Sequence, residues 1–230
     1  ILCSDWSSDV CSSDLFIWNI TQSIKRDTTV MDKQISYPWR EENGGAPYYL
    51  MFLKDENTLI TELQSFPLND KEATLPAYQK RTLDTNKLLK SFSSYKKSIR
   101  NDEASILPES FFYSNDAIKP DGTKVVQAMV HLAQLNILDL ETGHVSGYRL
   151  EGEPDFSVFK SDEKIKSYFT RVQADDNYIY AVYWGKERWE RFETPHMNII
   201  HVYDWDGNLV QKIETDYSIG QMWIDPSRPY

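Results

Sequence analysis

The sequence predicts an all-β fold built from similar four-stranded units. Short apolar segments rich in Tyr, Ile, Val and Trp alternate with Asp, Asn, Gly and Pro, which is the pattern of strands separated by turns. Long helical periodicity is hard to find. A hairpin pattern, in which an apolar segment ends at Asp or Asn and a second segment follows the turn, recurs at Asn19, Asp84, Asp139 and Asp204.

The first fifteen residues are excluded from the fold prediction. Asp5–Leu15 reads DWSSDVCSSDL, where serines beside aspartates favour local side-chain bonds over helix or strand. This segment resembles the translation of a sequencing-library adapter, which implies that residues 1–15 are a non-native leader. Both cysteines, Cys3 and Cys11, lie in it. Residues 16–230 therefore offer no disulfide, thiolate metal site or thiol nucleophile.

The first two hairpin copies are weak. One is expected around Asn19, with Ile24 beyond the turn, and the next around Asp84, with Leu88 beyond the turn. Two earlier apolar segments belong to the unit that contains Asp84. They are PYYLMFL at 47–53 and NTLITEL at 57–63.

The second half of the chain gives two clearer units. Asp206-Gly207 suits a tight turn, because glycine accepts positive φ without steric cost. The strands of the first unit are expected at 111–114, 124–129, 134–139 and 144–150, and those of the second at 167–174, 177–185, 198–205 and 208–214. A further inner strand, IGQMWID at 219–225, is expected to open another unit.

The hairpin copies recur at intervals of about 55 to 65 residues, which suggests stacked or radial β units. Each interval has room for about four strands, the size of one propeller blade with its loops. The segments YIYAVYWG, IIHVYDWDGNLVQKIETD and IGQMWIDPSRPY resemble the six-bladed TolB-like propeller proteins. The resemblance extends loosely over residues 16–230 and is sharpest from Val125 to Tyr230.

The resemblance implies a partial propeller of about three and a half of six four-stranded blades. We expect residues 16–230 to be a fragment of one such domain, truncated at both ends. Family members resemble secreted or lipid-anchored proteins, which implies the periplasm or cell surface of a Gram-negative bacterium. A lipid anchor would then lie on the missing N-terminal segment. No apolar run in the sequence is long enough to span a membrane.

Charge and motifs narrow the function classes. The net charge of −10 argues against a nucleic-acid partner, and three of the acidic residues lie in the leader. The four histidines show no metal-ligand spacing, and no serine has a nucleophile motif. DWDGN at 204–208 is interpreted as a hairpin turn rather than a calcium loop. We therefore predict no catalytic residue, no metal site and no cofactor.

The candidate binding residues lie in GKERWERFETPHM, residues 185–197. This segment is long for a connection between two strands, and loops on a rigid scaffold often carry binding. Its cations and aromatic residues suit contact with a protein or a carbohydrate. The alternative is a loop whose aromatic residues fold back over its own blade. The candidates are Lys186, Arg188, Trp189, Arg191 and Phe192.

The leading hypothesis is an exported, non-enzymatic propeller that binds a ligand or a partner protein through loops on one face. Two alternatives remain open, because a propeller fold does not decide function. One is a propeller hydrolase or lyase with a metal site in its channel. The expected inner-strand starts, Phe111, Ser167, Tyr168 and Ile219, are poor metal ligands and weaken that alternative. The other is a propeller appended to a missing enzyme domain.

Overall fold

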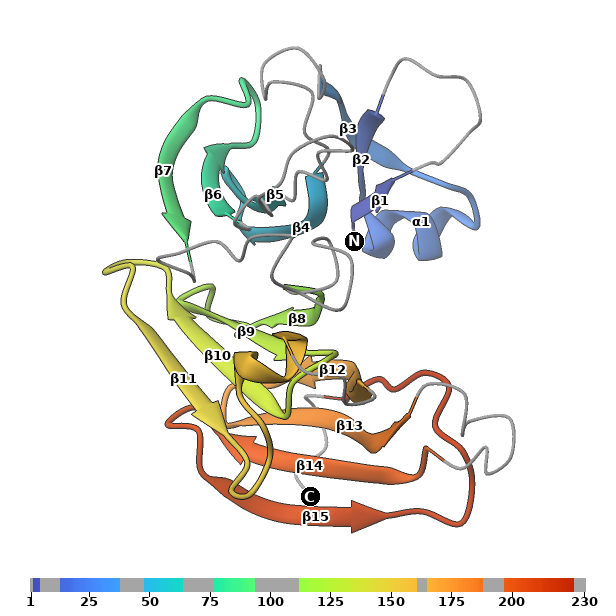
Figure 1. The fold of residues 1–230 in the computed structure, drawn as a ribbon. Helices are drawn as coiled ribbons and strands as arrows, with labels where there is room; N and C mark the ends of the chain where they lie inside the picture. Colours follow the sequence, from blue (N-terminus) through green and yellow to red (C-terminus); the bar gives the residue numbers. More distant parts are fainter. Residues whose placement is uncertain are drawn as a thin grey trace. The chain divides into compact units, whose positions relative to one another are not determined.

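The computed structural model describes residues 2–4, 13–37, 48–63, 77–93, 112–160, 165–187 and 197–225 of the 230-residue chain. The chain divides into two compact units (Figure 1). Residues 1–65 and 76–92 form the first unit, and residues 66–75 and 93–230 form the second. Each unit contains two antiparallel sheets.

The first unit begins with a three-stranded sheet in the order β1-β2-β3. Its elements are β1 (Leu2–Ser4), β2 (Ser13–Trp18), α1 (Ile20–Arg26) and β3 (Met31–Tyr37). The composition of residues 1–15 favoured neither helix nor strand, and that expectation is wrong for β1 and the start of β2. In the structure Cys3 pairs with Phe16, and Leu15 pairs with Ile35. Such pairing is possible for this composition because strand hydrogen bonds join backbone groups and need no particular side chain.

The hairpin expected at Asn19 is wrong. Asn19 is instead the N-cap of α1, and its side-chain oxygen accepts a hydrogen bond from the backbone N–H of Gln22 at 2.9 Å. Asparagine suits turns and N-caps equally well, because its side chain replaces a backbone acceptor in both. No glycine follows Asn19 to close a tight turn. The helix ends at Asp27, which takes a left-handed φ of 48°.

The second sheet of this unit has the order β4-β5-β6-β7. Its strands are β4 (Tyr48–Asp55), β5 (Thr58–Leu63), β6 (Ala77–Thr82) and β7 (Leu88–Ser93). The two predicted apolar strands are β4 and β5, and the hairpin around Asp84 joins β6 to β7. Thr82, rather than Asp84, closes this turn, because its hydroxyl accepts from the N–H of Lys87 at 2.9 Å.

The second unit contains two four-stranded sheets, ordered β11-β10-β9-β8 and β12-β13-β14-β15. The first comprises β8 (Ser114–Ile118), β9 (Lys124–Met129), β10 (Gln134–Asp139) and β11 (Val145–Arg149). The second comprises β12 (Lys166–Ala174), β13 (Tyr178–Glu187), β14 (Ile199–Asp204) and β15 (Leu209–Glu214). A short 3-10 helix, η2 (Phe156–Lys160), lies between β11 and β12.

These two sheets pack face to face around one apolar core (Figure 1). Their inner strands are joined directly, because the Asn115 amide of β8 donates to the Phe169 carbonyl of β12 at 3.0 Å. Four-stranded antiparallel sheets stacked with adjacent inner strands are propeller blades, so the prediction of an all-β partial propeller is confirmed. The core comprises Ala117, Val126, Ala128, Ala133, Leu135, Ile137, Tyr168, Phe169, Val172, Ile179, Ala181, Tyr203 and Trp205.

The outer hairpins of the two blades share one turn design, as predicted. Asp139 ends β10, and its carboxylate accepts from the backbone N–H groups of Glu141 and Thr142 at 2.9 and 2.7 Å. Asp204 ends β14 and accepts from the N–H groups of Asp206 and Asn208 at 3.0 and 2.8 Å. Each turn then contains a glycine in the left-handed region, with φ of 80° at Gly143 and 82° at Gly207.

Two strand predictions in this unit need correction. Of the inner strand expected at 111–114, Phe111 lies outside the described residues and the strand begins only at Ser114. Phe112 is buried and packs against Phe156 at a ring separation of 6.2 Å. The segment 219–225 alternates like a strand but forms none, since no described strand pairs with it. Its first residue is still anchored, because the Ile219 N–H donates to the Met197 carbonyl at 2.7 Å.

Candidate functional site

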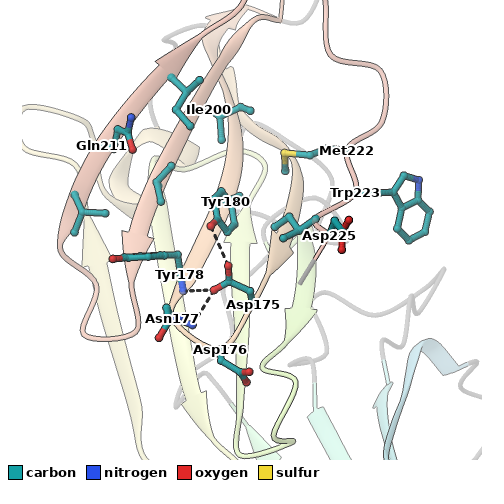
Figure 2. Close-up of a pocket in the computed structure, with 14 residues that line it drawn as sticks. Asp175, Asp176, Asn177, Tyr178, Tyr180, Ile200, Gln211, Met222, Trp223 and Asp225 are labelled. Atoms are coloured by element: carbon teal, nitrogen blue, oxygen red, sulfur yellow. Dashed lines mark hydrogen bonds between the residues drawn. The ribbon is translucent and has the colours of Figure 1, made fainter. Parts of the chain in front are cut away.

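Two hollows lined by described residues of the second unit could receive another molecule. The larger is a groove of about 800 Å³ on the exposed face of the β12–β15 sheet, which we call the sheet-face groove (Figure 2). Its lining combines aromatic, aliphatic and acidic side chains. The lining residues are Asp175, Asp176, Asn177, Tyr178, Tyr180, Ile200, Val202, Val210, Gln211, Ile213, Met222, Trp223, Ile224 and Asp225.

Asp175 belongs to the β12–β13 turn and has a structural role. Figure 2 shows its carboxylate accepting from the N–H groups of Asn177 and Tyr178, both at 2.7 Å, and from the Tyr180 hydroxyl at 2.9 Å. Its backbone carbonyl accepts from the Trp205 indole at 3.0 Å. Asp175 therefore serves the turn rather than a ligand in the groove.

The apolar floor of the sheet-face groove is a blade-packing face. Val202 stands two positions before Asp204 and pairs with Tyr180. The equivalent pair of the preceding blade, Ile137 with Val126, is buried in the core between the two sheets. The same positions that bury one blade against the next thus line the groove, which marks it as a packing surface rather than a ligand site.

The smaller hollow lies where strands end, and we call it the strand-end pocket. It has a volume of about 310 Å³ and a mixed polar and apolar lining. Three segments supply it: the β9–β10 turn, the β11–β12 connection with η2, and the first residues of β12. The lining residues are His131, Gly152, Glu153, Pro154, Val158, Lys166 and Tyr168.

A β-bulge aims Tyr168 into this pocket. The β12–β13 register shifts between Ser167 and Phe169, so Tyr168 is skipped in the strand register. Its N–H donates instead to the Val130 carbonyl of the preceding blade at 2.7 Å. Tyr168 and Phe169 are consequently both buried, at 2% and 0% exposure, although neighbours on a regular strand alternate. Bulges commonly redirect side chains in this way near functional sites.

Hydrogen bonds fix the polar groups of the strand-end pocket. The Tyr168 hydroxyl donates to the Glu153 carboxylate at 2.8 Å, which joins the β11–β12 connection to the inner strand. His131 contacts the Lys166 carbonyl through Nδ1 at 3.3 Å. A carbonyl oxygen only accepts, so His131 carries a proton on Nδ1 in this contact. The pocket therefore presents a positioned carboxylate beside an anchored strand start.

An aromatic cluster lies behind the pocket. Tyr183 packs against Tyr168 at a ring separation of 6.3 Å and stacks on His201 at 4.3 Å. The Tyr203 hydroxyl and His201 Nδ1 are 3.1 Å apart. Burial, and secondly the nearby negative charge of Glu153, raise the pKa of Tyr183. The cluster gives the pocket a rigid, apolar support.

Of the five residues predicted from sequence, the structure describes only Lys186. It lies near the end of β13, pairs with Ser167 and places its ammonium 5.1 Å from the Trp184 ring centroid. This puts Lys186 at the same strand ends as the pocket, without lining it. The other four candidates, Arg188, Trp189, Arg191 and Phe192, lie outside the described residues.

Sequence reasoning missed the residues that line the strand-end pocket. The β9–β10 turn, the β11–β12 connection and the start of β12 approach each other only after two blades have stacked. The unusual length of the β11–β12 connection was the one available signal. Among the residues that the structure describes, no group of three or more His, Cys, Asp or Glu side chains is placed to hold a metal ion.

No described helix is both long and apolar enough to cross a lipid bilayer. A family model described as TolB-like 6-blade propeller-like matches residues 60–227. A search of curated proteins finds no match.

Solved structures similar to this chain include the β-propeller domain of Cps50 (Swd1) from Myceliophteria thermophila, with 8% identity and a TM-score of 0.43 over 88% of this chain and 54% of that one. A Lactobacillus plantarum protein has 14% identity and a TM-score of 0.41 over 89% and 52%. Hydrazine synthase from Kuenenia stuttgartiensis has 8% identity and a TM-score of 0.40 over 88% and 54%. The chain covers little more than half the length of each.

Proposed function

Because the chain belongs to the TolB-like six-blade propeller family, we propose that it is a propeller binding module that holds a ligand or partner at its strand ends. The observation that carries this proposal is the strand-end pocket, where residues from three separate segments meet. Connections on a rigid β scaffold are where binding commonly resides. Lys186 at the same strand ends would extend the contact surface toward the connection that follows β13.

The partner we propose is a protein or a carbohydrate, and the location is the periplasm or cell surface of a Gram-negative bacterium. Family membership supports an exported location, and a lipid anchor on an N-terminal segment would be consistent with it. The acidic net charge of −10 supports a partner other than nucleic acid. The fold alone supports no specific reaction.

The hydrogen bonds that the polar groups of the pocket already make favour binding over catalysis. Tyr168 and Glu153 are hydrogen-bonded to each other, and Tyr168 also holds the preceding blade through Val130. Both residues therefore contribute to the blade junction. A ligand that contacts them would bind to a preformed surface, which lowers the ordering cost of binding.

A ligand screen combined with hydrogen–deuterium exchange tests this function. The purified chain is screened by thermal shift against amino acids, short peptides and oligosaccharides, and each hit is then mapped by exchange. We expect protection at residues 130–133, 151–158 and 166–168. Protection confined to the sheet-face groove at 175–180 and 222–225, or the absence of any hit, would refute binding at the strand ends.

A further inference from the structure

We propose that the strand-end pocket binds a small zwitterion, a ligand whose ammonium group contacts Glu153 and whose carboxylate contacts Lys166. This inference rests on the proposed binding function and, for this pocket, replaces the protein or carbohydrate with a small ligand of defined charge. A free amino acid and a whole dipeptide share this chemistry, because each carries one ammonium and one carboxylate. The pocket supplies one positioned group of each charge, and the two come from different segments of the blade pair.

Glu153 is suited to an ammonium group because its carboxylate is fixed but not saturated. One oxygen accepts from the Tyr168 hydroxyl at 2.8 Å, and the tyrosine ring is 2% exposed, which restrains the carboxylate. An ionised carboxylate can accept about four hydrogen bonds over its two oxygens. No described cation forms an ion pair with Glu153. A ligand ammonium would therefore gain charge-assisted bonds at a positioned acceptor.

Lys166 is suited to a carboxylate. Its side chain is exposed at the mouth of the pocket, and in the described part of the chain it pairs with no acidic group. Its backbone is held, because His131 contacts its carbonyl at 3.3 Å and its register partner is Glu187 on β13. The ammonium thus projects from a fixed strand start.

The shape of the pocket limits what can enter. Pro154 and the buried Val158 give it an apolar wall, and about 310 Å³ is at the small end of ligand pockets. Gly152 has φ of 82°, and a Cβ there would meet no atom within 4 Å, so the mouth is open at this point. The volume suits a ligand of one or two residues with an aliphatic side chain.

Two other ligand classes fit less well. The Glu153 carboxylate would repel phosphates and other polyanions. A sugar usually stacks on an exposed aromatic face, but Tyr168, the aromatic residue among the lining residues, is almost fully buried. A zwitterion satisfies both charges and leaves its side chain against the apolar wall.

L-leucine and its blocked derivatives provide the direct test, by isothermal titration calorimetry on the full chain. We expect L-leucine to bind, and both N-acetyl-L-leucine and L-leucinamide to bind at least about tenfold more weakly, because each lacks one charge. Equal binding of either blocked form would overturn the proposal, as would no binding of L-leucine up to about 10 mM. Leucyl-glycine distinguishes the two sources, since tighter binding than L-leucine assigns a dipeptide and weaker binding a free amino acid.

Charge-removing variants locate the site. Glu153→Gln and Lys166→Met should each weaken L-leucine binding by about tenfold or more. Glu151→Gln and Lys87→Met are matched controls, because both residues are exposed and neither lines the pocket. Circular dichroism checks that every variant is folded. Equal loss in the controls, or no loss in the two pocket variants, would overturn the assignment.

The ligand class and the binding function can fail separately. If no amino acid or peptide binds but an oligosaccharide protects residues 151–158 and 166–168 from exchange, the zwitterion is wrong and the strand-end binding function stands. If no compound protects these residues, both are wrong.

Discussion

His201 offers the sharpest test of how the aromatic face of the β12–β15 blade is packed. Its side chain is buried at 2% exposure, stacks on Tyr183 with an interplanar angle of 12°, and lies within hydrogen-bond distance of the Tyr203 hydroxyl. Phe169 meets its ring edge-on at 6.4 Å. The group that faces it across the ladder is Lys212 of β15. Protonation would place a cation in this apolar cluster.

The size of the expected loss of stability at low pH follows from the pKa of His201. Burial, and secondly the positive charge of Lys212, lower this pKa from 6.5 to about 4. The folded state therefore binds fewer protons than the unfolded state between these two values. The stability that His201 contributes is fully present above pH 6.5 and is lost as the pH falls toward 4. The difference corresponds to about 2–3 kcal/mol in the free energy of unfolding.

Urea denaturation followed by tryptophan fluorescence, repeated from pH 7 down to about pH 4.5, measures this loss. His201→Phe should lower stability at neutral pH, because the Tyr203 hydroxyl loses its partner, and should flatten the pH dependence. His144→Gln is the control, since His144 is exposed on the β10–β11 turn. If His201→Phe retains the pH slope of the parent chain, the buried imidazole is not its source and the reasoning fails.

Three further outcomes can be checked by denaturation. Gly207→Ala should lower the free energy of unfolding by at least about 2 kcal/mol, because φ is 82° and a Cβ would overlap the Tyr148 ring. Gly220→Ala is the control and should be nearly neutral, because a Cβ there meets no atom. Equal effects of the two substitutions would contradict this prediction. Phe169→Ala should cost about 3–5 kcal/mol, because the residue is 0% exposed in the shared core, and a loss below about 1 kcal/mol would refute its role. Burial opposes ionisation of Asp121, but hydrogen bonds within its turn outweigh burial and lower its pKa to about 2. Asp121→Asn should therefore reduce the loss of folding stability that occurs between pH 3.8 and about 2. An unchanged acid transition would contradict this prediction.

The strands that sequence predicted best are those with the strongest local signal. The predicted segments 124–129 and 134–139 coincide with β9 and β10, because both are nearly continuous apolar runs bounded by turn residues. The Asp139 and Asp204 hairpins were equally clear, since their side chains close the turns within a few residues. Such elements are determined by nearby residues and can be predicted without knowledge of tertiary contacts.

The elements that the sequence did not predict depend on neighbouring residues and strand partners, which a local pattern does not specify. Asn19 could close a turn or cap a helix, and the residues that follow it formed α1. The segment 219–225 alternates like a strand, but a strand also needs a hydrogen-bonded neighbour. The bulge at Tyr168 has no sequence signature, although it decides which side chain enters the strand-end pocket.

The candidate site shows the same division. The connection after β13 was proposed as a binding loop from its length and composition, and that proposal stays a prediction, because the structure describes only Lys186 of its five candidates. The contact between Glu153 and Tyr168 could not be predicted from sequence, because the β11–β12 connection meets the start of β12 only in the folded chain. Contacts between blades are a property of stacking, which a periodic pattern indicates only in outline.

Two segments of the second unit are anchored near their first residues by backbone atoms: the start of β12 and the segment that begins at Ile219. Tyr168 donates its N–H to Val130, and Ile219 donates its N–H to Met197, both at 2.7 Å. Because both bonds join backbone atoms, this anchoring does not require a particular side chain at any of the four positions. A repeat joined in this way can diverge freely in sequence while keeping its spacing. The weak sequence similarity among the hairpin copies is therefore compatible with a regular arrangement of blades. In such chains, blades are better aligned by these backbone hydrogen bonds than by residue identity.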